Sequence, residues 1–316
     1  MAKVSLKNLR KNPKALAIVC GLLVLSNVVM VGMLAQRTAS LDSERRYPLI
    51  DVARNFIEQE HFIVNIQPLR EKLNQIVDAE PDQTVSVYFE FLNTGANVQI
   101  NNDSRFYSAS LVKLPSAMVV MKKVEDGDWK LGSRLVLYEQ DKDKRYGQLH
   151  QEQVGTSFTI EELLRRLLID SDNTAHNMLM RNLTSEELDE LKDAIGLDDL
   201  FDEKSEISAK EYSRLFRSLY NSSFLKREGS QHVLDLLTKT QFDNMLPSGM
   251  PADVLFAHKI GEDDDQRNYL DSGIVYLQDR PYLLTVMVKQ HDQPAAEQIM
   301  KRISEAAHGY VNEYER

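Results

Sequence analysis

The sequence predicts a mixed α/β protein of the α+β kind, built on one antiparallel five-stranded sheet with helices on both faces. Two strands around the turn residues 93–95 come first, in TVSVYFEFLNTGANVQINN. A helix-rich stretch follows from residue 110 to about 240, and three strands come next, in DVLFAHKIG, SGIVYLQD and PYLLTVMVKQ. A last helix, PAAEQIMKRISEAAHGYVNEY, closes the chain. Helices from both ends of the chain can therefore cover a sheet made of all five strands.

The cysteine and histidine content argues against a metal site. The 316 residues include one cysteine, Cys20, so neither an intrachain disulfide nor a thiolate metal cluster can form. The seven histidines are scattered, without the HxxxH or HxH spacing that is typical of transition-metal sites. We therefore expect neither a metal nor a cofactor.

The N-terminus carries a strong signal for a membrane segment. Five basic residues stand in the first 14 positions, and an uncharged, mostly apolar stretch follows at 15–36. At about 1.5 Å per residue, a helix of this length spans a hydrocarbon core of about 30 Å. The stretch is longer than the core of a cleaved signal peptide, and a poor cleavage site follows it. An uncleaved anchor is therefore favoured over a cleaved signal.

The charges around this segment predict its orientation. Basic residues precede it and mixed charges follow it, which favours an N-terminus inside the cell. The sequence then divides into a basic cytoplasmic segment at 1–14, a transmembrane anchor at 15–36, a polar juxtamembrane tether at 37–61 and one catalytic-type domain at 62–316. We expect a single-pass protein of the cell membrane whose domain lies outside the cytoplasm.

The charge of the external part bears on its partners. The five basic residues of 1–36 carry +5 and the whole chain carries −10, so the remainder carries −15. Because phosphate binding depends on basic patches, a surface this acidic argues against nucleic acid as a partner. We expect an acidic, soluble surface and a monomer.

A serine and a lysine three residues apart open the helix-rich stretch, in FYSASLVKLPSAMVV. On a helix N-terminus, Ser110 and Lys113 share a face, so the hydroxyl and the amine come within hydrogen-bonding reach. The helix is apolar nearly all round, which is typical of burial in a domain centre. Burial lowers the pKa of a lysine and lets it accept a serine proton near neutral pH. Free backbone N–H groups at the helix start could hold a developing oxyanion.

Spacing alone does not identify a catalytic pair, because Ser-x-x-Lys arises by chance in most chains of this length. Ser223 and Lys226 have the same spacing in NSSFLKREGS. That segment is a polar turn with no apolar helix behind it. For an isolated pair, a structural role is therefore the favoured interpretation.

Two further elements favour catalysis at the first pair. Ser171, Asp172 and Asn173 directly follow the predicted helix TIEELLRRLLI, and Lys259 and Gly261 stand at the end of a predicted strand. Each has a structural alternative, since Ser-Asp-Asn is a good helix cap and Lys-x-Gly is often a turn. The order Ser-x-x-Lys, Ser-Asp-Asn, Lys-Thr-Gly is that of class A β-lactamases and penicillin-binding proteins. The ordered trio therefore predicts one shared site.

On these motifs the chain resembles the penicillin-recognising serine acyl-enzyme family, and within it the class A β-lactamase-like branch. The resemblance covers about residues 62–312; YSASLVKLPSA and DSDNTA are specific matches and HKIG is a partial one. It implies a three-layer sandwich, a five-stranded antiparallel sheet flanked by helices, with an additional all-helical subdomain.

The resemblance also implies a role for each residue of the trio. Ser110 would attack an acyl carbon, in a β-lactam or a D-alanyl peptide, and form an acyl-enzyme. Lys113 would take the Ser110 proton, directly or through water, and Ser171 would relay a proton to the leaving nitrogen. These roles fit the residue types: a nucleophile beside a base, and a proton relay.

Substrate-binding roles come from the same resemblance. Asn173 would bind the amide side chain of the substrate, and Lys259 would hold the substrate carboxylate and tune Ser171. The backbone N–H groups of Ser110 and of Glu262, the residue after Gly261, would form the oxyanion hole.

Two departures from the family pattern concern the substrate and turnover. Ile260 stands where the family usually has threonine, so a hydroxyl that helps to bind the carboxylate is missing. The family's deacylating glutamate, followed four residues later by asparagine, has no match after Ser-Asp-Asn. Glu203 and Glu206 are the nearest candidates, but Ile207 and Lys210 occupy the fourth positions after them.

Three functions remain open from the sequence. The preferred one is a membrane-anchored, β-lactamase-like serine hydrolase that forms an acyl-enzyme on Ser110. The second is a D-alanyl-D-alanine carboxypeptidase or penicillin-binding protein that acts on peptidoglycan peptides. The third is a cell-wall or penicillin sensor that uses the same pocket without turnover.

Overall fold

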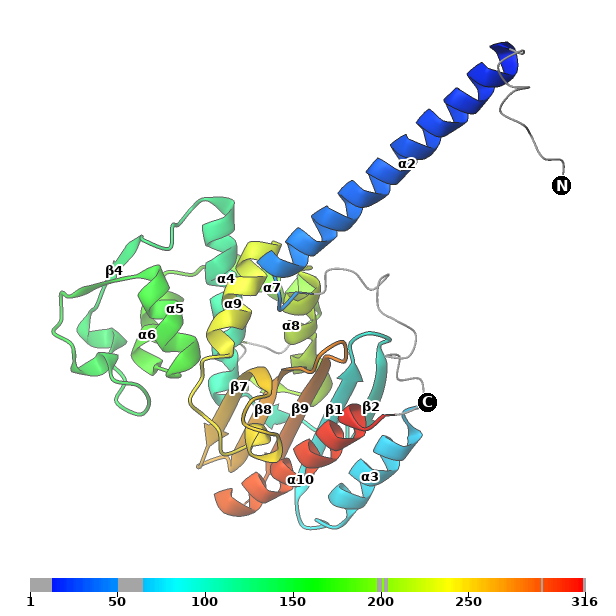
Figure 1. The fold of residues 1–316 in the computed structure, drawn as a ribbon. Helices are drawn as coiled ribbons and strands as arrows, with labels where there is room; N and C mark the ends of the chain where they lie inside the picture. Colours follow the sequence, from blue (N-terminus) through cyan, green and yellow to red (C-terminus); the bar gives the residue numbers. More distant parts are fainter. Residues whose placement is uncertain (1–12, 51–64, 198–200, 202–203, 291, 315–316) are drawn as a thin grey trace. The chain divides into compact units, whose positions relative to one another are not determined.

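The computed structural model describes residues 13–50, 65–197, 201, 204–290 and 292–314 (Figure 1). The chain divides into two compact units, Met1–Pro48 and Leu49–Arg316. Among these described residues, the first unit contains one helix, α2 (Pro13–Arg46), and the second contains the sheet and the remaining helices.

Helix α2 includes the predicted anchor and the first part of the predicted tether. Side chains between 13 and 46 are described only at 14, 17 and 21–35, so the anchor at 15–36 falls partly outside the described residues. Residues 37–46 continue the helix, whereas 1–12 and 51–61 lie outside the described part of the chain. No described helix combines the length and the apolar character that a membrane span requires.

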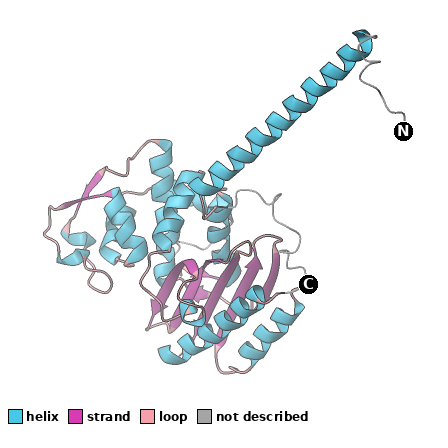
Figure 2. Ribbon diagram, viewed as in Figure 1, coloured by secondary structure: helices cyan, strands magenta, loops and turns pink. Residues whose placement is uncertain are grey.

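The second unit is built on a five-stranded antiparallel sheet, as the sequence predicts (Figure 2). The two early strands and the three late strands all belong to it, in the spatial order β2-β1-β9-β8-β7. The strands are β1 (Thr84–Phe91), β2 (Ala96–Ile100), β7 (Leu255–Asp263), β8 (Asn268–Tyr276) and β9 (Tyr282–Lys289). β7 forms one edge of the sheet, and this position leaves its outer backbone groups without a neighbouring strand.

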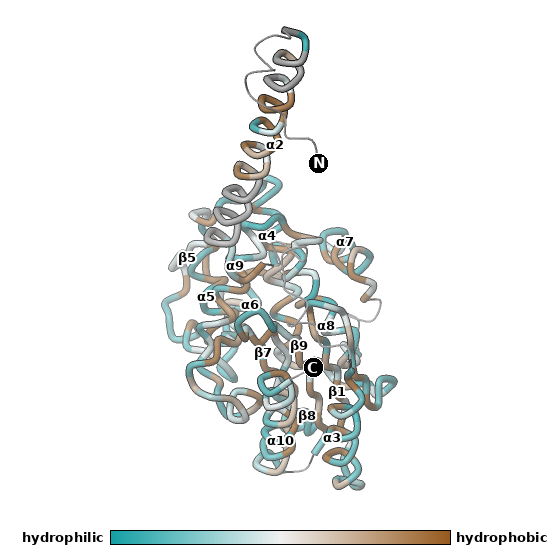
Figure 3. The backbone as a smooth tube through the Cα atoms, turned by 45° about the vertical axis from the view of Figure 1, so that its right-hand side comes forward, coloured by the Kyte–Doolittle hydropathy of each residue, from teal (hydrophilic) through white to brown (hydrophobic). Residues whose placement is uncertain are grey.

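Alternating side chains of the sheet face two helical layers. Apolar residues of β1, such as Val85 and Phe89, pack in one core with α3 (Gln67–Asp78) and α10 (Gln293–Asn312). The alternate residues Tyr88 and Glu90 face the other side, where Arg217 of α8 (Ala209–Asn221) donates to both. Hydrophilic and hydrophobic positions alternate along α3 and α10 in Figure 3, as expected of helices that cover one face of a sheet. The predicted three-layer order is confirmed.

A helical region occupies the chain between β2 and β7. It contains four further helices besides α8 and α9 (Arg227–Leu237): α4 (Lys113–Asp126), α5 (Ile160–Ile169), α6 (Asn173–Met180) and α7 (Ser185–Ile195). Capping boxes begin α5 and α7, where Thr159 pairs with Glu162 and Thr184 with Glu187. These caps explain why both helices begin where the sequence places them.

Two small antiparallel ladders within this region were not predicted. β3 (Phe106–Tyr107) pairs with β6 (Glu206–Ile207), and β4 (Arg134–Val136) pairs with β5 (Ser157–Thr159). Each strand has two or three residues, which is too short for a period-2 pattern to identify. The first ladder holds the segment just before Ser110 in place.

Candidate active site

Ser110 lies in a short 3-10 turn, Ala109–Val112, that leads from β3 into α4. Ala109 enters this turn with a φ of 47°, in the left-handed region. Lys113, the first residue of α4, is 2% exposed, and its Nζ donates to Ser110 Oγ over 2.9 Å. The predicted pair is therefore in contact, with Ser110 before the α-helix rather than within it.

Four oxygen atoms lie within hydrogen-bonding distance of Lys113 Nζ. Its Nζ lies 2.5 Å from Ser171 O, 3.1 Å from Ser171 Oγ and 2.6 Å from Asn173 Oδ1, in addition to Ser110 Oγ. A neutral amine can donate to the two carbonyl oxygens, Ser171 O and Asn173 Oδ1, and accept one hydrogen bond from a serine hydroxyl. Burial lowers the pKa of Lys113 to about 7, although the charges of Asp172 and Asp143 oppose this. The amine can therefore accept the Ser110 proton near neutral pH.

Ser171 connects the two buried lysines. It follows α5 with a φ of 53°, and its Oγ accepts from Lys113 Nζ at 3.1 Å and from Lys259 Nζ at 2.9 Å. Lys259, on β7, is 1% exposed, and burial and the charge of Lys113 lower its pKa well below the usual value. A hydroxyl between two amines can pass a proton from one side to the other.

Asp172 fixes the geometry around Ser171. Its carboxylate caps α6 by accepting from Ala175 N at 2.9 Å, and it accepts from Gln148 N and Leu149 N at 2.7 and 2.8 Å. A Cβ on Gly147 would lie 2.1 Å from Asp172 Oδ2, so only glycine allows this approach. The loop 143–148 is thereby held beside the nucleophile.

β7 approaches the nucleophile turn closely at Gly261. A Cβ at this position would lie 3.0 Å from both Ser108 O and Leu111 Cγ, so the absence of a side chain lets the strand lie against the turn. Because β7 is an edge strand, its outer N–H groups face away from the sheet. The Glu262 N–H is thus suited to the predicted oxyanion hole with that of Ser110.

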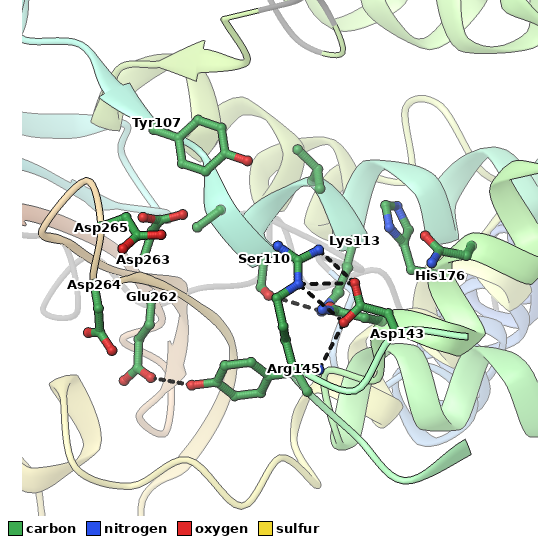
Figure 4. Close-up of a pocket in the computed structure, with 15 residues that line it drawn as sticks. Tyr107, Ser110, Lys113, Asp143, Arg145, His176, Glu262, Asp263, Asp264 and Asp265 are labelled. Carbon is green, nitrogen blue, oxygen red and sulfur yellow. Dashed lines mark hydrogen bonds and ion pairs between the residues drawn. The ribbon is translucent and has the colours of Figure 1, made fainter. Parts of the chain in front are cut away.

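The pocket in front of Ser110 has a volume of about 460 Å³ (Figure 4). Of the predicted residues, Ser110, Lys113, Asn173 and Glu262 line it, whereas Ser171 and Lys259 are buried and join it through the Lys113 hydrogen bonds. Further lining residues were not predicted: Tyr107, Ala109, Val112, Asp143, Arg145, Tyr146, His176, Asn177, Asp263, Asp264 and Asp265. Tyr107, Ala109 and Val112 belong to the motif around Ser110, whereas the fold of the loop 143–148, of α6 and of the β7–β8 turn brings the others to the pocket.

Three polar contacts join residues that line this pocket. The Arg145 guanidinium binds the Asp143 carboxylate at 2.6 Å and lowers the pKa of that carboxyl. Asn173, whose Oδ1 accepts from Lys113, also hydrogen-bonds to Asp143. Tyr146 donates to Glu262 Oε2 over 2.7 Å, and this bond joins the helical region to β7.

Comparisons with known proteins identify the family. Residues 68–311 match the model of the Beta-lactamase enzyme family. The chain belongs to that family. It is accordingly a serine hydrolase.

Relatives of known sequence or structure agree with this family. A β-lactamase of Streptomyces fradiae is 28% identical over 234 residues, which cover 68% of this chain and 76% of the relative. The solved acyl-enzyme complex of a PBP-A mutant with penicillin G has a TM-score of 0.73 at 23% identity, over 79% of this chain and 98% of that one. The β-lactamase of Sphaerobacter thermophilus has a TM-score of 0.72 at 21% identity, over 80% and 100%. These structural likenesses show the fold.

Within the Beta-lactamase enzyme family, this chain differs at the residue after Lys259. The Ile260 side chain is 3% exposed and packs in the core with α3 and α10, so it does not line the pocket. Lys259 and Ser272 are register partners on the opposite side of the strand pair. The sequence correctly indicated a missing hydroxyl, but the position of the side chain could not be read from the motif.

The two glutamates nearest to the family's deacylating position offer no replacement in the described residues. Glu206 belongs to β6, where its backbone pairs with Tyr107 and its carbonyl accepts from Arg105, and it does not line the pocket. Glu203 lies outside the described residues. The pocket-lining base that the sequence did not single out is His176.

Proposed function

We propose that this hydrolase forms an acyl-enzyme on Ser110 with β-lactams or related amides. One observation carries the proposal: Lys113 Nζ lies 2.9 Å from Ser110 Oγ, and burial lowers its pKa to about 7. A lysine that is largely neutral near physiological pH can remove the serine proton as the acyl bond forms. Proximity alone does not distinguish this pair from a structural one, but the lowered pKa does.

The remaining groups would complete acylation. As Ser110 Oγ bonds to the acyl carbon, its proton moves to Lys113, and the carbonyl oxygen becomes an oxyanion that the Ser110 and Glu262 N–H groups stabilise. When this tetrahedral intermediate collapses, the bond between the acyl carbon and the leaving nitrogen breaks. Ser171 gives its proton to the leaving nitrogen and takes one from Lys113, to which its Oγ is hydrogen-bonded.

Lys259 supports the same step electrostatically. Its Nζ donates to Ser171 Oγ at 2.9 Å and to Ile260 O at 3.0 Å, which fixes the amine beside the relay hydroxyl. We assign it the substrate carboxylate, whose negative charge would favour the ammonium form of this buried amine when substrate binds. Because the Ile260 side chain packs in the core, recognition of that carboxylate does not depend on the side chain at 260.

A second candidate is a D-alanyl-D-alanine carboxypeptidase that acts on peptidoglycan peptides. The sequence has no Glu-x-x-x-Asn between Asn173 and α8, the position at which class A β-lactamases carry their hydrolytic glutamate. The fold is similar to that of PBP-A, a mutant of which forms an acyl-enzyme complex with penicillin G. A peptidase would use the same acylation machinery on a different amide.

We also propose that residues 15–36 anchor the protein in the cell membrane, with 1–14 inside and the folded domain outside. The five basic residues before the apolar stretch and its length of about 22 residues support this. Protease treatment of intact cells or spheroplasts tests it. The domain should be degraded while an N-terminal tag on residue 1 stays protected, and a domain protected until lysis would contradict the orientation.

Intact mass of the full-length protein, followed over time with a penicillin, tests the acyl-enzyme. The proposal expects an adduct of the drug's mass that forms and then clears as drug is consumed, and none on Ser110→Ala. An adduct that persists would instead favour the peptidase or a non-turnover sensor, which D-alanyl peptides then separate. A folded protein that forms no adduct would contradict β-lactams as substrates.

A further inference from the structure

A second polar pair lies one helical turn beyond the catalytic one, on the same two helices. Lys113 of α4 meets Asn173 of α6, and three residues further along each helix Ser116 Oγ lies 3.1 Å from His176 Nε2. Three residues of an α-helix advance about 4.5 Å, so the second pair lies close to the first. Ser110 and His176 line the same pocket.

The hydrogen bonds of Ser116 define the state of the imidazole. The Ser116 hydroxyl is fully buried and donates its one proton to Val112 O over 2.8 Å, a stronger acceptor than the Met180 sulfur at 3.3 Å. Its oxygen is left to accept from His176 Nε2. In the neutral imidazole the lone pair is then on Nδ1. That atom has no protein hydrogen-bond partner among the described residues, and the ring is partly exposed and lines the 460 Å³ pocket (Figure 4).

Two of the carboxylates that line the pocket are already engaged. The Asp143 carboxylate binds Arg145 and Asn173, and Glu262 accepts from Tyr146. Burial and the ammonium charges of the two nearby lysines lower the pKa of His176 to about 3, so the imidazole stays unprotonated across the physiological range. Its free nitrogen is an available base.

We propose that His176 Nδ1 is the general base that activates the water for hydrolysis of the acyl-enzyme. This rests on the proposed function, since it needs an ester on Ser110. Water bonds to the ester carbon and gives a proton to Nδ1. Collapse breaks the bond between that carbon and Ser110 Oγ, and the imidazolium returns the proton to Oγ through the Lys113 amine, which lies 2.9 Å from Oγ. The products are the free acid and the original serine.

Intact mass of the full-length protein after a pulse of benzylpenicillin separates the two steps. We expect His176→Ala to acylate within about threefold of the unaltered chain and to lose the adduct about 100- to 10,000-fold more slowly, the usual range for removal of a general base. His176→Asn, which can still donate to Ser116 but has no basic nitrogen, should be equally slow. His232→Ala is the matched control, because His232 lies on α9 outside this pocket.

Imidazole added to the acylated His176→Ala variant provides a readout that a packing defect would not give. The proposal expects the adduct to clear faster in proportion to the concentration of neutral imidazole. Equal clearance by His176→Ala and the unaltered chain would overturn it, as would an adduct that persists on the unaltered chain while the proposed acylation stands. The absence of any adduct on the unaltered chain would overturn both the acyl-enzyme and this role for His176.

Discussion

Two Ser-x-x-Lys pairs in this molecule share a spacing and a place at the start of a helix, since α9 begins at Arg227, where the sequence predicts a polar turn with no apolar helix behind it. Ser110 and Lys113 stand at a buried helix start, where the amine is 2% exposed and has four oxygen neighbours. Ser223 and Lys226 are both exposed, and the Ser223 hydroxyl donates to Ser218 rather than to the lysine. The Lys226 Nζ lies 3.5 Å from Glu125 O, at the limit of a hydrogen bond. Burial and the set of hydrogen-bond partners, not the spacing, distinguish the first pair from the second.

Replacement of each serine by alanine should give the largest difference between the two pairs. Ser110→Ala is expected to abolish the penicillin adduct, because no other pocket-lining hydroxyl in the described part of the chain is hydrogen-bonded to an amine whose pKa is lowered to about 7. Ser223→Ala should acylate at the unaltered rate. Intact mass measures both, and an adduct that survives Ser110→Ala and is lost in Ser223→Ala would reverse the assignment.

Removal of the two lysines should have the next largest effect. Lys113→Met keeps most of the side-chain volume but removes the base, so we expect acylation to fall about 100- to 10,000-fold. Lys226→Met is the matched control and should leave the rate unchanged. Stopped-flow acylation gives the rates, and circular dichroism at rising temperature checks that both variants fold. Similar losses in the two variants would contradict a specific role for Lys113.

The pH dependence of acylation should follow Lys113. A base whose pKa is about 7 is protonated at lower pH and cannot take the Ser110 proton. We therefore expect the acylation rate to be level above about pH 8 and to fall about tenfold per pH unit below about pH 6, measured on a pH-stable β-lactam. A rate that does not change between mildly acidic and mildly alkaline pH would show that the amine is not the group that loses its proton.

Gly261 tests the close approach of β7 to the nucleophile turn. A methyl group there would meet Ser108 O and Leu111 Cγ at 3.0 Å and push the strand away by a few tenths of an ångström. We expect Gly261→Ala to slow acylation about tenfold, since the oxyanion donors would be misplaced. Gly132→Ala, where nothing lies within 4 Å of the new Cβ, is the control and should have the unaltered rate.

Ile260→Thr should have the smallest effect on activity and a visible effect on stability. The side chain lies in the apolar core, so the new hydroxyl would be buried rather than presented to the substrate. An unpaired buried hydroxyl costs about 1–3 kcal/mol. We expect a reduced free energy of unfolding in urea and an acylation rate within about threefold of the original. A large gain in acylation would show that position 260 faces the substrate.

The fold could be predicted from the sequence because its signals are periodic and long. All five strands of the sheet occur in the predicted order, and the helix that ends at Ile169 is where the sequence places it. β7 continues to Asp263, so Lys259 lies within the strand rather than at its end, and β8 begins at Asn268, before the predicted segment. The two- and three-residue ladders were missed because so few residues show no periodicity. The sequence predicts a polar tether at 37–61 without assigning its first part a secondary structure, and residues 37–46 are helical, since polar composition does not exclude a helix.

The candidate site likewise contains residues that could be predicted from the sequence and residues that could not. Ser110, Lys113 and Ser171 belong to motifs, and the structure places Lys113 within hydrogen-bonding distance of both serines. Arg145 and His176 belong to no motif. The loop that carries Arg145 reaches the pocket only because Asp172 accepts from its backbone, a tertiary contact with no local signature. His176 could have been noticed three residues after Asn173 on one helix face, but only the pocket shows that its free nitrogen is accessible.

The ionisation of Lys113 tests the central claim most directly. Nuclear magnetic resonance of the full-length protein with ¹³C at the lysine ε-carbon follows each amine through its titration, and Lys113→Arg assigns the signal. The account predicts a midpoint near pH 7 for Lys113, as its burial requires. A Lys113 amine that remains fully protonated above about pH 9 would contradict its role as the base that activates Ser110.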